Sequence, residues 1–333
     1  MLRLVIAGAL VSTLSGCSGW QSALDPQGPQ AKHLADLIWS FTAICTVIWG
    51  LVMIALAVAL LRRRSERLDP LTTDPSSERT MLGVIGACVA ATAVIVMALT
   101  VLSYFSQRAL FAKSDPAVTM QVTGYQWWWD IRYQEPRPDH SVTTANEIHI
   151  PVGEPVLIKL QSADVIHSFW MPSLAGKMDL ITGQDNELHF VADRPGIYRG
   201  QCAEFCGLQH AKMGMLVIAS SREEYQAWRD AQLKPAERPN DAERQKGLDV
   251  FLSRPCVMCH TIRGTPAGSR VGPDLTHLAS RRYIAAGTLP MSRGNLAAWI
   301  VDPHGIKPGV NMPLTKLAPD ELEALAGYLA GLQ

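Results

Sequence analysis

Two groups of side chains with metal-binding chemistry stand out in this 333-residue chain. The first is His167 followed by the segment Cys202-Ala-Glu204-Phe-Cys206-Gly-Leu-Gln-His210-Ala-Lys-Met213. The second is Cys256-Val-Met-Cys259-His260. Thiolate, imidazole and thioether ligands suit copper in the first group, and Cys-x-x-Cys-His is the haem-attachment signature. A chain that carries both is expected to move single electrons between two metal centres.

The first group has the spacing of a blue-copper loop, because Cys206, His210 and Met213 follow one another closely. Cys202 adds a second thiolate four residues earlier. Two thiolates can bridge two copper ions, so that both ions share one electron and change geometry little when oxidised. A tetrahedral zinc site is the alternative. The methionine and the late position in a β-rich region disfavour it.

In the second group, Cys256 and Cys259 would hold the porphyrin through thioethers and His260 would be the proximal iron ligand. We predict Met312, in Asn311-Met312-Pro313, as the distal ligand, because thioether ligation raises the potential as in cytochromes c. Three downstream side chains remain rivals for this place: His277, His304 and Met291. A redox-active Cys-x-x-Cys pair is a further alternative, but no thioredoxin-like βαβ pattern surrounds it.

The segments around these groups differ in pattern. Residues 113–220 alternate apolar and polar side chains between Pro and Gly turns, which predicts an all-β sandwich or barrel. Residues 221–241 read as a helix, Ser221 to Lys234, and a Pro-rich linker. Residues 242–333 read as an all-α domain whose last helix begins at Pro319. Such a small helical domain needs the apolar centre that a covalent cofactor would supply.

The N-terminal part, residues 17–112, is predicted to be a transmembrane hairpin. Residues 37–61 and 81–107 contain no charged side chain, and each run exceeds the roughly 20 residues that span a bilayer. Five arginines lie between the two runs and place that loop in the cytoplasm: Arg62, Arg63, Arg64, Arg67 and Arg79. Everything after residue 108 then faces the periplasm or outer surface.

Residues 1–16 have the features of an export signal, with Arg3 before an apolar stretch. Leu14-Ser15-Gly16-Cys17 resembles a lipobox, which predicts a lipidated Cys17; an ordinary signal peptide is the alternative. Cys45 and Cys88 fall in the spans. The other four cysteines could form disulfides in an exported domain, but their metal-binding contexts argue against it. The formal net charge is zero, so the chain lacks the excess of basic residues that is typical of nucleic-acid-binding proteins.

The chain resembles subunit II of haem–copper cytochrome c oxidases. The resemblance lies in His167-Ser-Phe-Trp170, in the 202–213 segment and in Gly124-Tyr-Gln-Trp127-Trp128-Trp129. Gly272-Pro273-Asp274-Leu275 and Lys307-Pro308-Gly309 resemble class I cytochrome c domains fused to subunit II in caa-type oxidases. The implied fold is a multi-domain membrane protein: a two-helix hairpin, a cupredoxin domain with a dinuclear copper A centre, and a cytochrome c domain.

The resemblance also implies residue roles. Cys202 and Cys206 would bridge two coppers, His167 and His210 would each bind one, and Met213 and the Glu204 carbonyl would complete them. The Glu204 carboxylate would reach a magnesium ion shared with subunit I. Electrons would enter at Trp127; the alternative role of this residue is that of an aromatic side chain in the core of the β domain. Glu78 would lie at the mouth of a proton pathway in subunit I, or be a solvated loop residue. The Pro273 carbonyl would orient the His260 ring.

The predicted function is the subunit through which electrons enter a proton-pumping terminal oxidase of a bacterial inner membrane. Electrons would pass from a donor, such as a cytochrome c or a quinol–cytochrome c reductase, through haem c to copper A. Subunit I, accompanied by subunit III among membrane lipids, would then reduce oxygen to water. Enzyme activity, as an oxidoreductase and translocase, would thus belong to the complex. The alternative is a membrane-anchored copper and haem electron carrier without a dedicated oxidase partner.

Overall fold

The computed structural model describes residues 18–62, 75–110, 115–137 and 140–333. The predicted signal peptide, Cys17 and three of the loop arginines lie outside these ranges. The chain divides into two compact units. One contains Lys32–Ala112, and the other contains Met1–Ala31 together with Lys113–Gln333.

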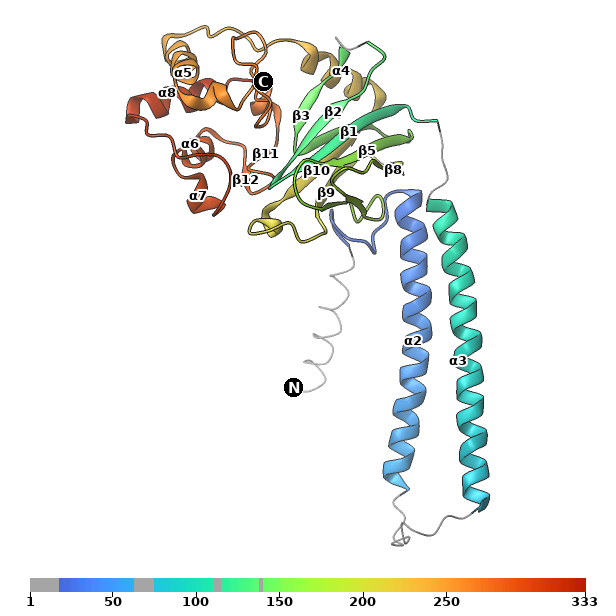
Figure 1. The fold of residues 1–333 in the computed structure, drawn as a ribbon. Coiled ribbons are helices and arrows are strands. Elements are labelled where there is room, and N and C mark those ends of the chain that lie inside the picture. Colours follow the sequence, from blue (N-terminus) through green and yellow to red (C-terminus); the bar gives the residue numbers. More distant parts are fainter. Residues whose placement is uncertain (1–17, 63–74, 111–114, 138–139) are drawn as a thin grey trace, which may run out of the picture. The chain divides into compact units, whose positions relative to one another are not determined.

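The smaller unit is a pair of long helices, α2 (Pro29–Leu61) and α3 (Pro75–Leu110), which lie side by side (Figure 1). Both are long and apolar enough to cross a membrane, and none of the most apolar window of either is buried. Large apolar side chains such as Trp49, Ile54 and Met97 are therefore exposed along their length. A water-soluble core helix would bury such residues, so the pair suits lipid surroundings.

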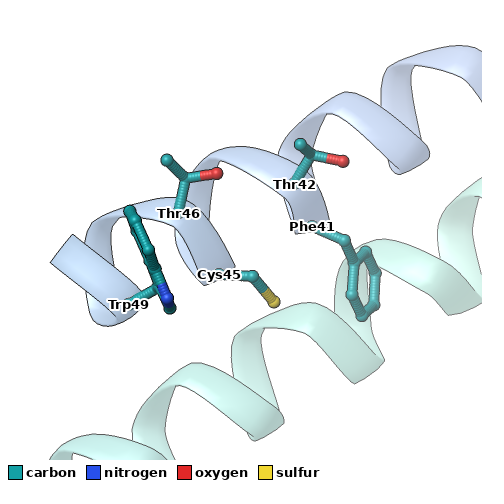
Figure 2. A pocket seen from close by; sticks show the side chains of 5 residues that line it. All are labelled: Phe41, Thr42, Cys45, Thr46 and Trp49. Atoms are coloured by element: carbon teal, nitrogen blue, oxygen red, sulfur yellow. The ribbon is translucent and has the colours of Figure 1, made fainter. Parts of the chain in front are cut away.

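A shallow pocket on α2 is lined by Phe41, Thr42, Cys45, Thr46 and Trp49 (Figure 2). Figure 2 shows the Phe41 and Cys45 side chains pointing toward α3. Cys45 is a free thiol, and the pocket offers no second soft ligand. Among the described residues of the hairpin, nothing therefore forms a metal site.

The β domain of the larger unit consists of two five-stranded sheets. The first has the order β3-β2-β1-β5-β8: Thr143–Ala145, Trp128–Tyr133, Val118–Tyr125, Val156–Ser162 and Asn186–Phe190. The second has the order β4-β10-β9-β6-β7: Glu147–Pro151, Gly214–Ser220, Gly196–Cys202, His167–Trp170 and Met178–Leu180. Alternate side chains of β1 are buried, as the apolar alternation predicted. Parallel pairing of β1 with β5 and of β10 with β4 gives the cupredoxin-like sandwich.

The chain before α2 packs on this sandwich. The Gln27 N–H donates to the Ser173 carbonyl (2.7 Å), and the Asp193 N–H donates to the Gln27 carbonyl (2.8 Å). A Cβ at Gly28 would lie 2.2 Å from the Val191 carbonyl oxygen, so only glycine fits there. The compact β unit therefore includes residues that the sequence analysis grouped with the membrane hairpin, because main-chain hydrogen bonds leave no apolar signature.

The C-terminal part is helical, as predicted. Its helices are α4 (Arg222–Leu233), α5 (Ala242–Ser253), α6 (Arg293–Val301), α7 (Pro303–Ile306) and α8 (Pro319–Leu329). Short 3₁₀ turns, η4 (Pro255–Met258) and η5 (Leu278–Ser280), and a small hairpin, β11 (Tyr283–Ile284) and β12 (Leu289–Pro290), complete it. Asp241 caps α5, its side chain accepting from the Arg244 N–H. At the crossing of α5 and α8, a Cβ on Gly247 would lie 2.2 Å from the Ala324 carbonyl oxygen.

The segment between α4 and α5 is held against the helical domain. The Ala236 N–H donates to the Arg263 carbonyl (2.9 Å). The Lys234 carbonyl lies 2.9 Å from the His277 Nε2 atom, and Arg263 donates back to the Leu233 carbonyl (3.3 Å). The short linker is thus part of the helical domain's surface.

Candidate metal centres

The first candidate centre lies at one end of the second sheet. His167 opens β6 and Cys202 closes β9, two strands that pair in antiparallel fashion. The loop after Cys202 carries Cys206 and returns to β10 through a single 3₁₀ turn, η3 (His210–Lys212). His167, Cys202 and Cys206 are buried, and their ligand atoms lie within 4.8 Å of one another.

The other predicted copper ligands join this cluster. The Cys202 sulfur lies 3.9 Å from His167 Nδ1 and 3.2 Å from the Glu204 carbonyl oxygen. The Cys206 sulfur lies 3.6 Å from His210 Nδ1 and 3.8 Å from the Met213 sulfur. The structure therefore brings together the whole predicted set: two thiolates, two imidazoles, a thioether and a carbonyl. Thiolate, thioether and imidazole are the donors that copper electron-transfer sites use, and a main-chain oxygen can be a weak further ligand.

The His167 ring is fixed by its surroundings. Asp164 Oδ1 lies 2.8 Å from His167 Nε2, which leaves Nδ1 facing the Cys202 sulfur. A Cβ at Gly124 would lie 2.8 Å from the ring, so this glycine makes room for it. Burial acts to lower the pKa of His167, but hydrogen bonds to Cys202 and Asp164 raise it overall. Sequence reasoning did not find Asp164, since a lone loop aspartate carries no motif.

The two cysteine side chains compete for one proton. The hydrogen bond from Cys206 lowers the pKa of Cys202 to about 3. The same contact, together with burial, raises the pKa of Cys206. Two adjacent buried thiolates repel each other, and copper bound to both would neutralise that repulsion. The donor set and its electrostatics therefore fit a thiolate-bridged metal centre.

The second candidate centre lies in the helical domain, at η4, which carries Cys256 and Cys259. His260 Nδ1 lies 2.8 Å from the Pro273 carbonyl, which confirms the predicted orienting contact. A Cβ at Gly272 would lie 2.8 Å from the His260 ring. Burial lowers the pKa of His260, so the imidazole is neutral and its Nε2 atom is available to iron.

A largely apolar pocket surrounds these three residues and suits a haem. Phe251, Leu325 and Leu329 are among its apolar walls. Buried Arg281 also lines it, and its Nε has no hydrogen-bond partner among the described groups. The Arg281 guanidinium also donates to the Asp274 carbonyl, so only its Nε is left without a partner. An apolar macrocycle with carboxylate substituents matches apolar walls and a buried cation with one donor to spare.

Met312 lines this pocket together with Cys256 and His260. His277 does not, because its two ring nitrogens lie against the Gln333 and Lys234 carbonyls. Among the described residues, Met291 and His304 are also absent from the lining. The placement therefore favours Met312 over its three rivals.

Replacing Met312 with alanine is expected to abolish the thioether-to-iron charge-transfer band and to lower the haem potential, because thioether ligation stabilises ferrous iron. Absorbance in the near infrared and redox titration of the purified protein measure both. Met291→Ala is the matched control and should leave both unchanged. Loss of the band in the Met291 variant, with the band kept in the Met312 variant, would show that the ligand assignment is wrong.

Trp127 lies between the two candidate centres. Its indole Nε1 donates to the Cys206 carbonyl (2.9 Å), and the residue is among those that line the haem pocket. A Cβ at Gly309 of the haem domain would lie 3.9 Å from the indole. The neighbouring tryptophans have other roles: Trp129 is fully buried against Phe169, and Trp128 stacks on Tyr125. The sequence could not assign separate roles to the three tryptophans, because strand alternation alone does not show what lies on each face.

Two predicted sites fall elsewhere. Glu78 is exposed in the first turn of α3, in the unit that contains neither candidate centre. The Glu204 carboxylate belongs to an exposed residue, although its carbonyl lies at the thiols. Both carboxylates are therefore available to a partner molecule rather than to the centres themselves.

Comparison with known proteins identifies the families that the two domains resemble. The profile of "Cytochrome C oxidase subunit II, periplasmic domain" matches residues 139–220, and that of "Cytochrome c" matches residues 245–333. Cytochrome c oxidase subunit 2 of Alkalihalophilus pseudofirmus is 34% identical, over 96% of this chain and 94% of that one. Cytochrome c oxidase subunit 2 of Bacillus subtilis is 29% identical, over 99% of this chain and 98% of that one. The crystal structure of the periplasmic domain of subunit II of cytochrome oxidase from Bradyrhizobium japonicum is 29% identical, with a TM-score of 0.34, over 36% of this chain and 95% of that one. This chain therefore belongs to the cytochrome c oxidase subunit II family and carries a C-terminal cytochrome c domain.

Proposed function

We propose that this chain receives electrons at a covalent haem c and passes them through a dinuclear copper A centre to subunit I of a proton-pumping oxidase. The observation that carries the proposal is the position of Trp127, which lines the haem pocket and donates to the main chain of Cys206. When bound, haem and copper supply one-electron redox chemistry. The chain's own residues hold them and keep the path between them short.

The proposed copper ligands are those that the structure gathers around the two thiols: His167, Cys202, Glu204 through its carbonyl, Cys206, His210 and Met213. The proposed haem residues are Cys256, Cys259, His260 and Met312. Two coppers are proposed because each thiol has its own imidazole beside it. A single metal would leave part of this set unused.

The surface around the copper loop supports a partner subunit. Phe205 is 76% exposed and Leu208 is 78% exposed, beside the exposed Glu204. Apolar side chains grouped around a carboxylate on a loop are typical of a protein-binding surface. We propose that subunit I covers this loop, that Glu204 shares a magnesium ion with it, and that Glu78 serves its proton pathway. The other proposed partners are subunit III and an upstream electron donor, either a cytochrome c or a quinol–cytochrome c reductase.

The proposed location is a bacterial inner membrane, with the copper and haem domains on the periplasmic side. It is supported by the two apolar helices and by Arg62 and Arg79, which flank the loop between them. The proposed lipidation of Cys17 would add a second anchor.

The test is to purify the full-length chain from membranes in mild detergent. A co-purifying haem–copper subunit is expected, together with two coppers for each covalent haem in the copper and haem domains. If the chain carries both cofactors but no oxidase subunit accompanies it, the carrier alternative holds. One copper with a blue-copper spectrum would contradict the dinuclear centre.

A further inference from the structure

Lys307 is one of the most buried charged side chains of the described chain. It belongs to the haem domain and is 2% exposed. Its ammonium donates to the Trp127 carbonyl (2.9 Å), in the turn between β1 and β2 of the copper domain. It also donates to the Ala285 carbonyl (3.3 Å), in the β11–β12 loop of its own domain. One cation thus joins the two domains through main-chain oxygens.

Burying this cation is costly. Desolvation lowers the pKa of Lys307 to about 7, and the ammonium of Lys212 acts in the same direction while Cys206 opposes them. A buried charge is retained when hydrogen bonds meet it, and here the two acceptors are carbonyl groups. The position requires a long side chain with a hydrogen-bond donor at its end. Lys307 therefore acts through its hydrogen bonds rather than through apolar packing.

The loop that offers the second carbonyl has an unusual backbone. Ala285 and Ala286 have φ values of 53° and 56°, in the left-handed region that costs an alanine about 1–2 kcal/mol. This conformation directs the Ala285 carbonyl to Lys307 and the Ala286 carbonyl to the Gly214 N–H (2.9 Å). Gly214 follows Met213, so the strained loop contacts the copper domain beside a proposed ligand. Strain of this kind persists only where surrounding contacts fix it.

The main chain that Lys307 holds belongs to the residue between the two centres. The Trp127 indole donates to the Cys206 carbonyl, and Gln126 Nε2 donates to the same oxygen (2.7 Å). From the haem domain, Asn311 donates to the Gln126 carbonyl (3.3 Å). The haem domain therefore holds the carbonyl groups of Gln126 and Trp127, and the copper loop holds the side chains of the same two residues.

We propose that Lys307 is a positioning residue for electron transfer between the domains. It fixes the main chain of Trp127, whose indole is hydrogen-bonded to Cys206 and lies beside Gly309 of the haem domain. The inference rests on the proposed function. In the step that it serves, one electron leaves the haem domain and the same electron reduces the copper centre. No bond is made or broken at Lys307 or Trp127.

The test uses the purified full-length oxidase with Lys307→Met, which keeps the length of the side chain and removes its donors. After photoreduction of the haem by a ruthenium complex, the haem-to-copper rate is followed optically. We expect a fall of about tenfold or more, since misplacement by about 1 Å can cost 100-fold. The haem and copper spectra should stay unchanged, because no ligand is touched. Lys307 lines the haem pocket and its charge acts on Cys206, so both midpoint potentials are measured and the rates are compared at equal driving force.

Lys316→Met is the matched control, because it removes the same charge from an exposed position of the same domain. Its rate should equal that of the unmodified protein. An unchanged rate in Lys307→Met at equal driving force, or a slower rate accompanied by altered ligand spectra, would overturn the positioning role.

If Lys307→Met does not assemble, Asn311→Ala removes the neighbouring hydrogen bond from the haem domain, to the Gln126 carbonyl, and tests the hold on the same turn more gently. A fall of about twofold to threefold is expected for one weaker hydrogen bond. An unchanged rate in that variant would then overturn the inference. The proposed function fails on a different result, namely an unmodified protein without two coppers or without haem-to-copper transfer.

Discussion

Replacing Cys202 with serine is expected to abolish the mixed-valence signal of the copper centre and to stop electron delivery to subunit I. The hydroxyl is a poor ligand for copper, and the exchange removes the thiol that His167 and the Glu204 carbonyl both face. Mutation of residues that only hydrogen-bond to metal ligands already lowers metal affinity or activity by about 10–100-fold. Loss of a bridging ligand should lower turnover by more than about 100-fold. Electron paramagnetic resonance measures the signal, oxygen uptake measures the turnover, and copper analysis counts the ions that remain bound.

The haem spectrum should be unaffected by this change, because Cys256, Cys259 and His260 lie in a separate fold. Cys45→Ser, in the membrane hairpin, is the matched control and should retain both copper ions and full turnover. Retention of two coppers and a mixed-valence signal in the Cys202 variant would show that this thiol does not bridge the centre.

Changing Cys256 and Cys259 together to alanine is expected to cut turnover with the native donor by at least about tenfold. Tethering supplies an effective concentration of about a millimolar, which a free cytochrome at micromolar concentration does not reach. Trp127 is only 6% exposed and lies against the haem domain, so an external donor cannot contact it directly in the docked state. Stopped-flow reduction and oxygen uptake with the native donor measure the loss.

The copper spectrum should remain in this double variant, and a small artificial reductant should still reduce the copper centre. Cys88→Ala, an exposed cysteine of α3, serves as the control for removing a cysteine. If turnover with the native donor equals that of the unmodified protein, the haem domain is dispensable and electrons reach copper by another route.

Residue types and spacing were sufficient to predict the local parts of this protein. The membrane helices follow from two charge-free runs, and the capped start of α5 follows from Asp241. The copper ligands were predicted because their loop is short: apart from His167, they lie within one segment of the sequence. Their convergence with His167 needs only two neighbouring strands, β6 and β9.

The contacts between domains could not be predicted, because the partners are far apart in sequence. Lys307 and Trp127 are separated by 180 positions, and neither carries a signal that names the other. The β11–β12 loop was missed because alanine is a poor marker for a left-handed turn, and only Gly287 hinted at one. α7 was also missed, although Asp302 before Pro303 is a readable start signal.

The linker pinned to the helical domain has a consequence for the protein's response to ionic strength. Because Leu233, Lys234 and Ala236 are hydrogen-bonded to that domain, the haem domain does not have to find the copper domain by diffusion. Dissolved salt screens exposed charges over about 8–10 Å, but it acts weakly on a buried ammonium bound to carbonyls. Salinity should therefore change only the rate of the outer encounter between donor and haem domain, and the inner transfer should proceed at the same rate in dilute and in concentrated salt.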